Sequence, residues 1–321
     1  MDCCRIRFLI PFARIVLMNR KIVVALSAVM LSLLVTPRHA FGKDFFLTIG
    51  GGYSPSGNQA SLERNVLFYK EVLENKKLGH RPHSVYFADG SSPKEDLQVV
   101  DRNSIPLANQ LMAEFFGSRR DLGLSYRDHQ IPNVQGDTST KNIREWFNTV
   151  GSELVAGDRL VIYVTSHGHS SDTKGRPHNT SISLWNRQRI RVNELAELLD
   201  ELPREVSVVA IMVQCHSGGF ARIVYDAGDS ENGFSDHNRC GFFATVHDRP
   251  AAGCTPDIDE ATYVEYSTYF WEAIAGRTRL GERIERPDYD GDGKVSFREA
   301  HAYTLLASDT IDLPITTSGE L

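Results

Sequence analysis

Two apolar runs in this sequence each end in a side chain that could take part in nucleophilic catalysis. The run 160–166 leads into His167, and the run 206–214 leads into Cys215. A cysteine attacks an amide usefully only when a proton donor reaches the leaving nitrogen and backbone N–H groups stabilise the oxyanion. Two strands that end side by side would hold these groups on rigid supports. The two runs therefore predict a Cys–His catalytic pair.

The elements around these two runs alternate between strands and helices. Periodicity and capping residues predict strands over 45–49, 84–88, 160–165, 206–213 and 241–246, a hairpin over 181–190, and helices over 60–77, 107–116, 139–150, 193–202, after 219 and over 263–275. Near-continuous apolar strands separated by helices favour an α/β fold with a mainly parallel sheet and helices on both faces. In such folds, sites lie beyond the carboxyl ends of the strands, where His167 and Cys215 both fall.

The N-terminal segment has the features of an export signal. A basic start at 18–21 precedes an apolar stretch at 22–35, and small residues follow. We expect residues 1–42 to be a signal peptide, with 18–42 as its functional part, and the mature protein to be periplasmic or secreted. An uncleaved anchor is the alternative, but the apolar stretch is shorter than the usual span of about 20 residues. No stable membrane span is expected after cleavage.

The mature chain is acidic and holds three cysteines. Outside residues 1–42 the sequence has 29 Lys and Arg against 40 Asp and Glu, a formal charge of −11, so nucleic acid is not an expected partner. In an oxidising compartment Cys240 and Cys254 could form a disulfide and leave Cys215 as the odd thiol. The sequence leaves this pairing open, because it does not give the distance between the two residues.

The segment 45–275 resembles the caspase and legumain superfamily of cysteine peptidases, clan CD. Ser-His-Gly at 166–168 and Gln-Cys-His-Ser-Gly-Gly-Phe at 214–220 are similar to its His-Gly and Cys blocks. Tyr-Phe-Ala-Asp-Gly at 86–90 fits its second strand. The His lies about 50 residues before the Cys, as in caspases, although caspases have one more residue between Gln and Cys.

Legumain is the most similar member of this superfamily. Gly-Phe-Phe-Ala-Thr-Val at 241–246, followed by Cys-Thr-Pro-Asp at 254–257, is similar to its Ala-Thr strand and Cys-x-x-Asp segment. The resemblance implies a caspase-like sheet and an endopeptidase that acts on protein or peptide substrates. It also implies Cys215 as nucleophile, His167 as acid and base, and the Gly168 and Cys215 N–H groups as oxyanion hole.

Three residues are candidates for substrate binding: Asp257, Gln214 and Asn58. An acidic residue at the base of a pocket favours a cationic or amide-bearing side chain, so Asp257 predicts cleavage after Asn or a basic residue. A solvated acidic loop without specificity is an equally good interpretation. Asn58 lies in Ser-Gly-Asn-Gln-Ala at 56–60, where legumain has an Arg and a nearby Asn ahead of its His-Gln-Ala segment. This chain has no Arg there and places its Asn differently, so we expect its pocket to differ from that of legumain.

Other interpretations of the same residues stay open. His169 and His216, together with His167 and Cys215, could bind zinc through nitrogen and sulfur. Such a site would require both strand ends to turn all four side chains inward. A catalytically silent, calcium-dependent binding or scaffold protein of the same fold is a further alternative. So is a transpeptidase, in which an amine takes the place of water.

Residues 288–299 match the ligand pattern of an EF-hand calcium loop. The expected ligands are Asp288, Asp290, Asp292, the carbonyl of Lys294, Ser296 and Glu299. Pro287 argues against an entering helix, whereas an exit helix over 297–308 is expected. We therefore expect a peptidase domain at 43–280, followed by an EF-hand-like calcium segment at 281–321. Ca²⁺ is the expected cofactor, and no organic cofactor is expected.

Overall fold

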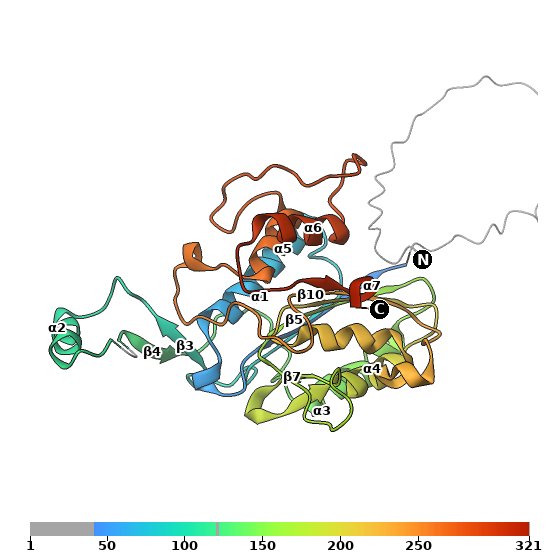
Figure 1. Ribbon diagram of the computed structural model, residues 1–321, viewed down its shortest axis with the longest axis horizontal. Helices are drawn as coiled ribbons and strands as arrows, with labels where there is room; N and C mark the ends of the chain where they lie inside the picture. The colour runs from blue at the N-terminus through green and yellow to red at the C-terminus, as the bar shows by residue number, and fades with distance from the viewer. Residues whose placement is uncertain (1–41, 120–121, 321) are drawn as a thin grey trace, which may run out of the picture.

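A six-stranded sheet organises the protein, whose computed structural model describes residues 42–119 and 122–320 (Figure 1). In spatial order the strands are β11 (Ile315–Thr316), β10 (Asn238–Phe243), β9 (Ser207–Met212), β5 (Arg159–Ser166), β1 (Asp44–Gly51) and β2 (His83–Phe87). All neighbouring strands pair in parallel except β11, which runs antiparallel to β10. The expected α/β fold with a mainly parallel sheet is confirmed.

Strand β5 shows why the sheet is covered on both faces. Alternate residues of a strand point to opposite faces, and every residue of β5 after Arg159 is buried. Leu160 and Ile162 join one apolar cluster, whereas Val161 and Tyr163 join the other. A strand that is buried on both faces has a nearly continuous apolar sequence, as predicted for this run.

Helices form a layer on each face of the sheet (Figure 1). One layer holds α1 (Ala60–Asn75), α5 (Tyr266–Ala275) and α6 (Phe297–Ala307), whose aromatic residues pack in one cluster. The other holds α3 (Thr140–Asn148) and α4 (Val192–Asp200), together with the 3-10 segment η4 (Ser217–Val224). The helix expected after Gly219 is therefore this 3-10 segment, which begins two residues earlier.

The remaining strands and helical turns are short and lie outside the six-stranded sheet. The structure gives a hairpin of β3 (Leu97–Val100) and β4 (Leu124–Arg127), the intervening α2 (Leu107–Phe116), and a small sheet of β6 (Gly168–His169), β7 (Ser181–Ser183) and β8 (Arg189–Arg191). Short 3-10 turns are η1 (Pro55–Gly57), η2 (Gly151–Glu153), η3 (Trp185–Arg187), η5 (Asp226–Gly228), η6 (Ser230–Asn232) and η7 (Glu260–Thr262). The β3–β4 hairpin and α2 project from the body of the protein (Figure 1).

The segment after residue 280 packs into the same body as the rest. Phe297 of α6 contacts the aromatic cluster of α5, and β11 extends the sheet beyond β10. The following helix α7 (Thr317–Glu320) is tied to β10 because Gly241 N–H donates to the Thr317 hydroxyl at 2.7 Å. No helix precedes the predicted calcium loop between residues 276 and 287, as Pro287 indicated.

The predicted signal peptide lies outside the described residues, apart from Gly42. Within the ranges that the structure describes, every helix is too short or too polar to cross a membrane.

Candidate functional site

The ends of β5 and β9 bring the backbones around His167 and Cys215 together. The two strands are parallel neighbours, and Val213 N–H extends their ladder by donating to the Val164 carbonyl at 3.0 Å. Both chains therefore leave the sheet at the same edge. Gly168 makes the close approach possible, since a Cβ at this position would overlap the carbonyl oxygen of Cys215 and lie 2.9 Å from its carbonyl carbon.

The imidazole of His167 is oriented from the turn before α1. Its Nε2 lies 2.8 Å from the Gly57 carbonyl oxygen and 2.9 Å from Gln59 Oε1, and its ring packs 5.4 Å from the ring of Tyr53. Because a carbonyl can only accept, Nε2 carries the proton and Nδ1 keeps a free lone pair. Burial lowers the pKa of His167, against the opposing effect of the Gly57 carbonyl. The ring is therefore neutral near pH 7 and able to accept a proton through Nδ1.

Cys215 is half-buried, and its thiol is held by the segment that follows β10. Ala251 N–H donates to Sγ at 3.3 Å. Among the hydrogen bonds of the described residues, none uses the Cys215 N–H as donor, so this N–H remains available to a ligand. The next residue, His216, adopts a left-handed conformation with φ of 59°, and its N–H donates to the Arg249 carbonyl at 2.9 Å. These contacts fix the turn that presents the thiol.

All three predicted substrate-binding residues are buried, with Asp257 5% exposed. Asn58 is fully buried: its Oδ1 accepts from Gly52 N–H and its Nδ2 donates to the Asp96 carbonyl, each at 3.0 Å. Gln214 is 1% exposed, with its amide nitrogen 3.9 Å from Met212 Sδ. Neither side chain reaches a surface that a substrate could contact, so we assign neither a substrate role. Burial of this kind depends on the tertiary fold and leaves no local signal in the sequence.

Asp257 sits where a loop joins the projecting hairpin, and its charge is paired. Arg102 Nε donates to Oδ2 at 2.7 Å, and Asp259 N–H donates to Oδ1 at 3.1 Å. Although burial acts to raise the pKa of the Asp257 carboxyl, these two donors hold it below its usual value. Val100 N–H also donates to the Pro256 carbonyl, so the hairpin is anchored at this point. Nothing in the local sequence indicates the Arg102 partner.

The two other cysteines of the described chain do not bridge to each other. Cys254 is a free thiol and packs beneath α1, in a different apolar cluster from Cys240 of β10. The disulfide that the sequence left open is therefore not formed. Burial raises the pKa of the Cys254 thiol well above its ordinary value, with smaller contributions from Glu265 and Cys215. Cys254 is accordingly protonated at neutral pH.

The alternative zinc site at the two strand ends is not assembled. His169 Nε2 pairs with the Ser183 hydroxyl at 2.8 Å, and His216 Nδ1 donates to the His247 carbonyl at 2.9 Å. Each imidazole is thus directed at a different protein group. The potential metal-binding groups within the described residues are His178, His247 and Glu320; Asp89, Asp96 and His129; and Asp288, Asp290 and Glu299.

The last of these groups comes from the predicted calcium loop. Asp288, Asp290 and Glu299 place their ligand atoms within 4.8 Å of one another. Glu299 Oε1 accepts from Tyr289 N–H at 2.7 Å, and Asp288 Oδ1 is buried without a hydrogen-bond partner. Of the expected acidic ligands, Asp292 lies outside this group of three. Ser296 caps α6, and Asp292 Oδ1 accepts from Lys294 N–H at 2.8 Å.

Comparison with known proteins gives distant structural similarities, among them two at 11% identity. No family model matches the chain, and no curated protein matches it. The protein GSU0716 from Geobacter sulfurreducens aligns with a TM-score of 0.48 at 11% identity, over 85% of this chain and 92% of that protein. Caspase-1 from Spodoptera frugiperda aligns with a TM-score of 0.42 at 11% identity, over 87% of each chain.

Proposed function

We propose that this protein is an exported cysteine endopeptidase of the caspase and legumain type. The observation that carries the proposal is the meeting of two turns at one sheet edge, where Gly168 lies against the peptide of Cys215. Parallel α/β sheets place their sites at this edge. The Cys215 thiol, the neutral His167 imidazole and an unused backbone N–H all belong to these two turns.

The residues have the following roles in this proposal. His167 Nδ1 removes the proton of the Cys215 thiol, and the thiolate attacks the carbonyl carbon of the scissile amide. The Gly168 and Cys215 N–H groups stabilise the oxyanion of the tetrahedral intermediate. His167 then returns the proton to the leaving amine, and the acyl group stays on sulfur. Water completes hydrolysis, whereas an incoming amine would complete transpeptidation.

The Gly57 carbonyl supports this role of His167 by fixing the proton on Nε2. The opposite tautomer would present Nδ1–H and could not act as a base. Replacement of Gln59 tests whether the side-chain contact adds to this effect, because the Gly57 carbonyl cannot be removed by substitution. In the proposal Gln59→Leu leaves the tautomer intact and reduces turnover only modestly.

Asp257 is the proposed determinant of cleavage after Asn or a basic residue. Its carboxylate accepts from Arg102 in the structure, and the Arg102 side chain is 74% exposed. A cationic or amide side chain of the substrate would replace this exposed guanidinium. The substrate side chain would then donate to Asp257 in place of Arg102, with a small net change in free energy.

The decisive experiment measures hydrolysis of fluorogenic peptides with Asn, Asp, Lys or Arg before the reporter. Wild type, Cys215→Ala and His167→Ala are compared with Cys254→Ala, which removes a different thiol that is buried and protonated. We expect turnover only in wild type and in Cys254→Ala, and covalent labelling of Cys215 by a peptide-based electrophile. Equal turnover in wild type and Cys215→Ala would refute the proposal. A folded protein without turnover or labelling would favour the silent binding protein.

We also propose that residues 288–299 bind calcium. Three predicted ligands already converge, and Asp288 Oδ1 is buried without a partner, which an oxygen-binding cation would provide. Asp288, Asp290, Asp292, Lys294 through its carbonyl, Ser296 and Glu299 would hold the ion. Ca²⁺ prefers six to eight oxygen ligands of this kind. Adding Ca²⁺ after chelation should raise the melting temperature of wild type but not of Glu299→Gln, and equal shifts in both would contradict the assignment.

A further inference from the structure

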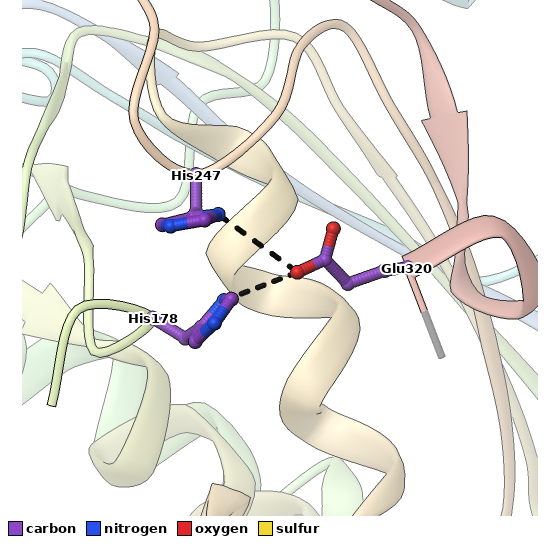
Figure 2. Close-up of side chains that lie close together, drawn as sticks. All are labelled: His178, His247 and Glu320. Carbon is purple, nitrogen blue, oxygen red and sulfur yellow. Dashed lines mark ion pairs between the residues drawn. The ribbon is translucent and has the colours of Figure 1, made fainter.

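Two histidines and a glutamate from distant parts of the chain converge on one point (Figure 2). His178 precedes β7, His247 follows β10, and Glu320 ends α7. The Nδ1 atoms of His178 and His247 lie 3.1 and 3.8 Å from the same carboxylate oxygen, Glu320 Oε1. We propose that His178, His247 and Glu320 form a binding site for a divalent transition-metal ion, with Zn²⁺ as the preferred ion.

The spacing of the three ligand atoms fits a metal better than a simple ion pair. Zinc bonds of about 2.0–2.1 Å place neighbouring ligand atoms of a tetrahedral site about 3.3 Å apart. The two measured separations of 3.1 and 3.8 Å lie on either side of this value. Moreover, His178 Nδ1 is buried and makes no hydrogen bond, although Glu320 Oε1 lies 3.1 Å away. An ion between the two groups would give this nitrogen a partner.

The protonation state of His178 also suits a metal ligand. Its ring lies 3.9 Å from the ring of His247, centroid to centroid. Burial lowers the pKa of His178 to about 4, with further lowering by His247 and Arg222. The imidazole is therefore neutral near pH 7, and the neutral form is the one that binds metals. His178 thus offers a neutral nitrogen to an ion beside the Glu320 carboxylate.

Some charged groups around the site favour a bound cation, and one opposes it. Glu320 and the nearby Asp248 favour a cation, and Asp248 affects the titration of both His178 and Glu320. Arg222 opposes a cation, with Nη2 3.5 Å from His178 Nε2. This contact is on the ring nitrogen that faces away from Glu320, and the guanidinium also stacks 5.5 Å from the ring of Tyr225. Removing the Arg222 charge should therefore strengthen metal binding.

The donor set selects the kind of ion. Two imidazole nitrogens and one carboxylate oxygen are typical zinc ligands, whereas Ca²⁺ and Mg²⁺ prefer oxygen alone. Three protein ligands leave a fourth position for water or another small ligand. His178 also lines a cavity of about 220 Å³ shared with Arg176, Arg222 and Asp229.

The site borders the turn that carries Cys215. His216 Nδ1 donates to the His247 carbonyl, and the Thr180 hydroxyl donates to the His216 carbonyl, each at 2.9 Å. An ion at His178 and His247 would thus fasten both segments that hold His216. This consequence rests on the proposed peptidase function: loss of the ion should lower turnover by loosening the turn, although no ligand touches the substrate.

The test titrates Zn²⁺ into the chelator-treated full chain by calorimetry. Co²⁺ is used as a spectroscopic probe of tetrahedral geometry. We expect one site that wild type and Cys215→Ala bind equally, and that His178→Gln, His247→Gln and Glu320→Gln each weaken. The expected loss exceeds about 100-fold, the upper end of the effect of mutating outer partners of metal ligands. Arg222→Gln should bind more tightly than wild type.

Two matched controls separate this site from others. His80→Gln removes an exposed histidine and Glu299→Gln alters the calcium loop, and neither should change Zn²⁺ affinity. Unchanged affinity in all three ligand variants, with circular dichroism showing that they are folded, would overturn the proposal. So would a Zn²⁺ site that disappears in Cys215→Ala. Because binding is measured without turnover, a failure of the peptidase proposal leaves this result intact.

Discussion

Replacing Gly168 by alanine tests whether the meeting of the two turns supports catalysis. The added Cβ would overlap the carbonyl oxygen of Cys215, and it would lie 2.9 Å from the Cys215 carbonyl carbon and 2.8 Å from Gln214 Cγ. An ordinary contact begins at 3.4 Å, and the overlapped carbonyl oxygen is the closest atom, so the Cys215 peptide must move by more than about 1 Å. Its N–H and Sγ move with it.

The size of this shift sets the expected effect on the rate. Catalytic groups must be held within about 0.5 Å of their productive positions, and a displacement of about 1 Å can cost about 100-fold. We therefore expect Gly168→Ala to lower kcat/KM by about 100-fold or more, which is at least about 2.7 kcal/mol of activation free energy. KM should change little, since the substituted residue is placed at the reacting centre.

The assay compares Gly168→Ala with Gly151→Ala on the best peptide of the fluorogenic panel. Gly151 lies in η2 and its Cβ would meet its nearest atom, Leu202 Cδ2, at 3.3 Å, so the control adds the same methyl group away from the site. Thermal unfolding shows whether each variant is folded. A folded Gly168→Ala with kcat/KM within about threefold of wild type would refute the positional reasoning, because the rate would then tolerate a displaced Cys215 peptide.

Three further changes have defined outcomes. Burial lowers the pKa of His301 to about 4, from about 6.5 in an unfolded chain. The contribution of the neutral His301 to the unfolding free energy is therefore fully present above about pH 6.5 and is lost as the pH falls toward 4. Over that range wild type should lose about 3 kcal/mol more unfolding free energy than His301→Gln in urea titrations, and parallel pH profiles would exclude this assignment. Asn58→Leu leaves the buried Gly52 N–H and Asp96 carbonyl without partners and should lower the unfolding free energy by about 2–4 kcal/mol. The cleavage preference should not change, and an altered preference would indicate that Asn58 contacts the substrate. Arg102→Ala exposes the Asp257 carboxylate. It should raise the ratio of kcat/KM for Lys peptides to kcat/KM for Asn peptides by about tenfold, or about 1.4 kcal/mol. An unchanged ratio would show that Asp257 does not determine specificity.

The five parallel strands of the six-stranded sheet could be predicted, because local apolar patterns encode them. The apolar runs before His167 and Cys215 have the composition of strands buried on both faces, and the structure pairs them as parallel neighbours. The strand expected over 241–246 forms three residues earlier, at Asn238–Phe243. Such shifts at boundaries arise because hydrogen bonds to neighbouring strands, and not local propensity, decide where a strand ends.

The partners of the site residues could not be predicted, since they depend on long-range contacts. Gly57 orients His167 from more than 100 positions away, through a carbonyl that any residue would supply. The Arg102 partner of Asp257 lies on a hairpin whose position only the folded chain defines. Likewise, nothing in the local sequence distinguishes Asn58, buried in a structural role, from an amide that lines a pocket.

The antiparallel strand β11 has a consequence for synthesis of the chain. It covers the outer edge of β10, yet it follows β10 by more than 70 residues. At about 5–20 residues per second, a ribosome needs roughly 4–14 s to add that stretch, during which the edge beside Phe242 and Phe243 has no strand to pair with. Open apolar edges template association with other chains. Nascent chains are thus most exposed to aggregation in this interval, and an insertion between α5 and β11 would prolong it.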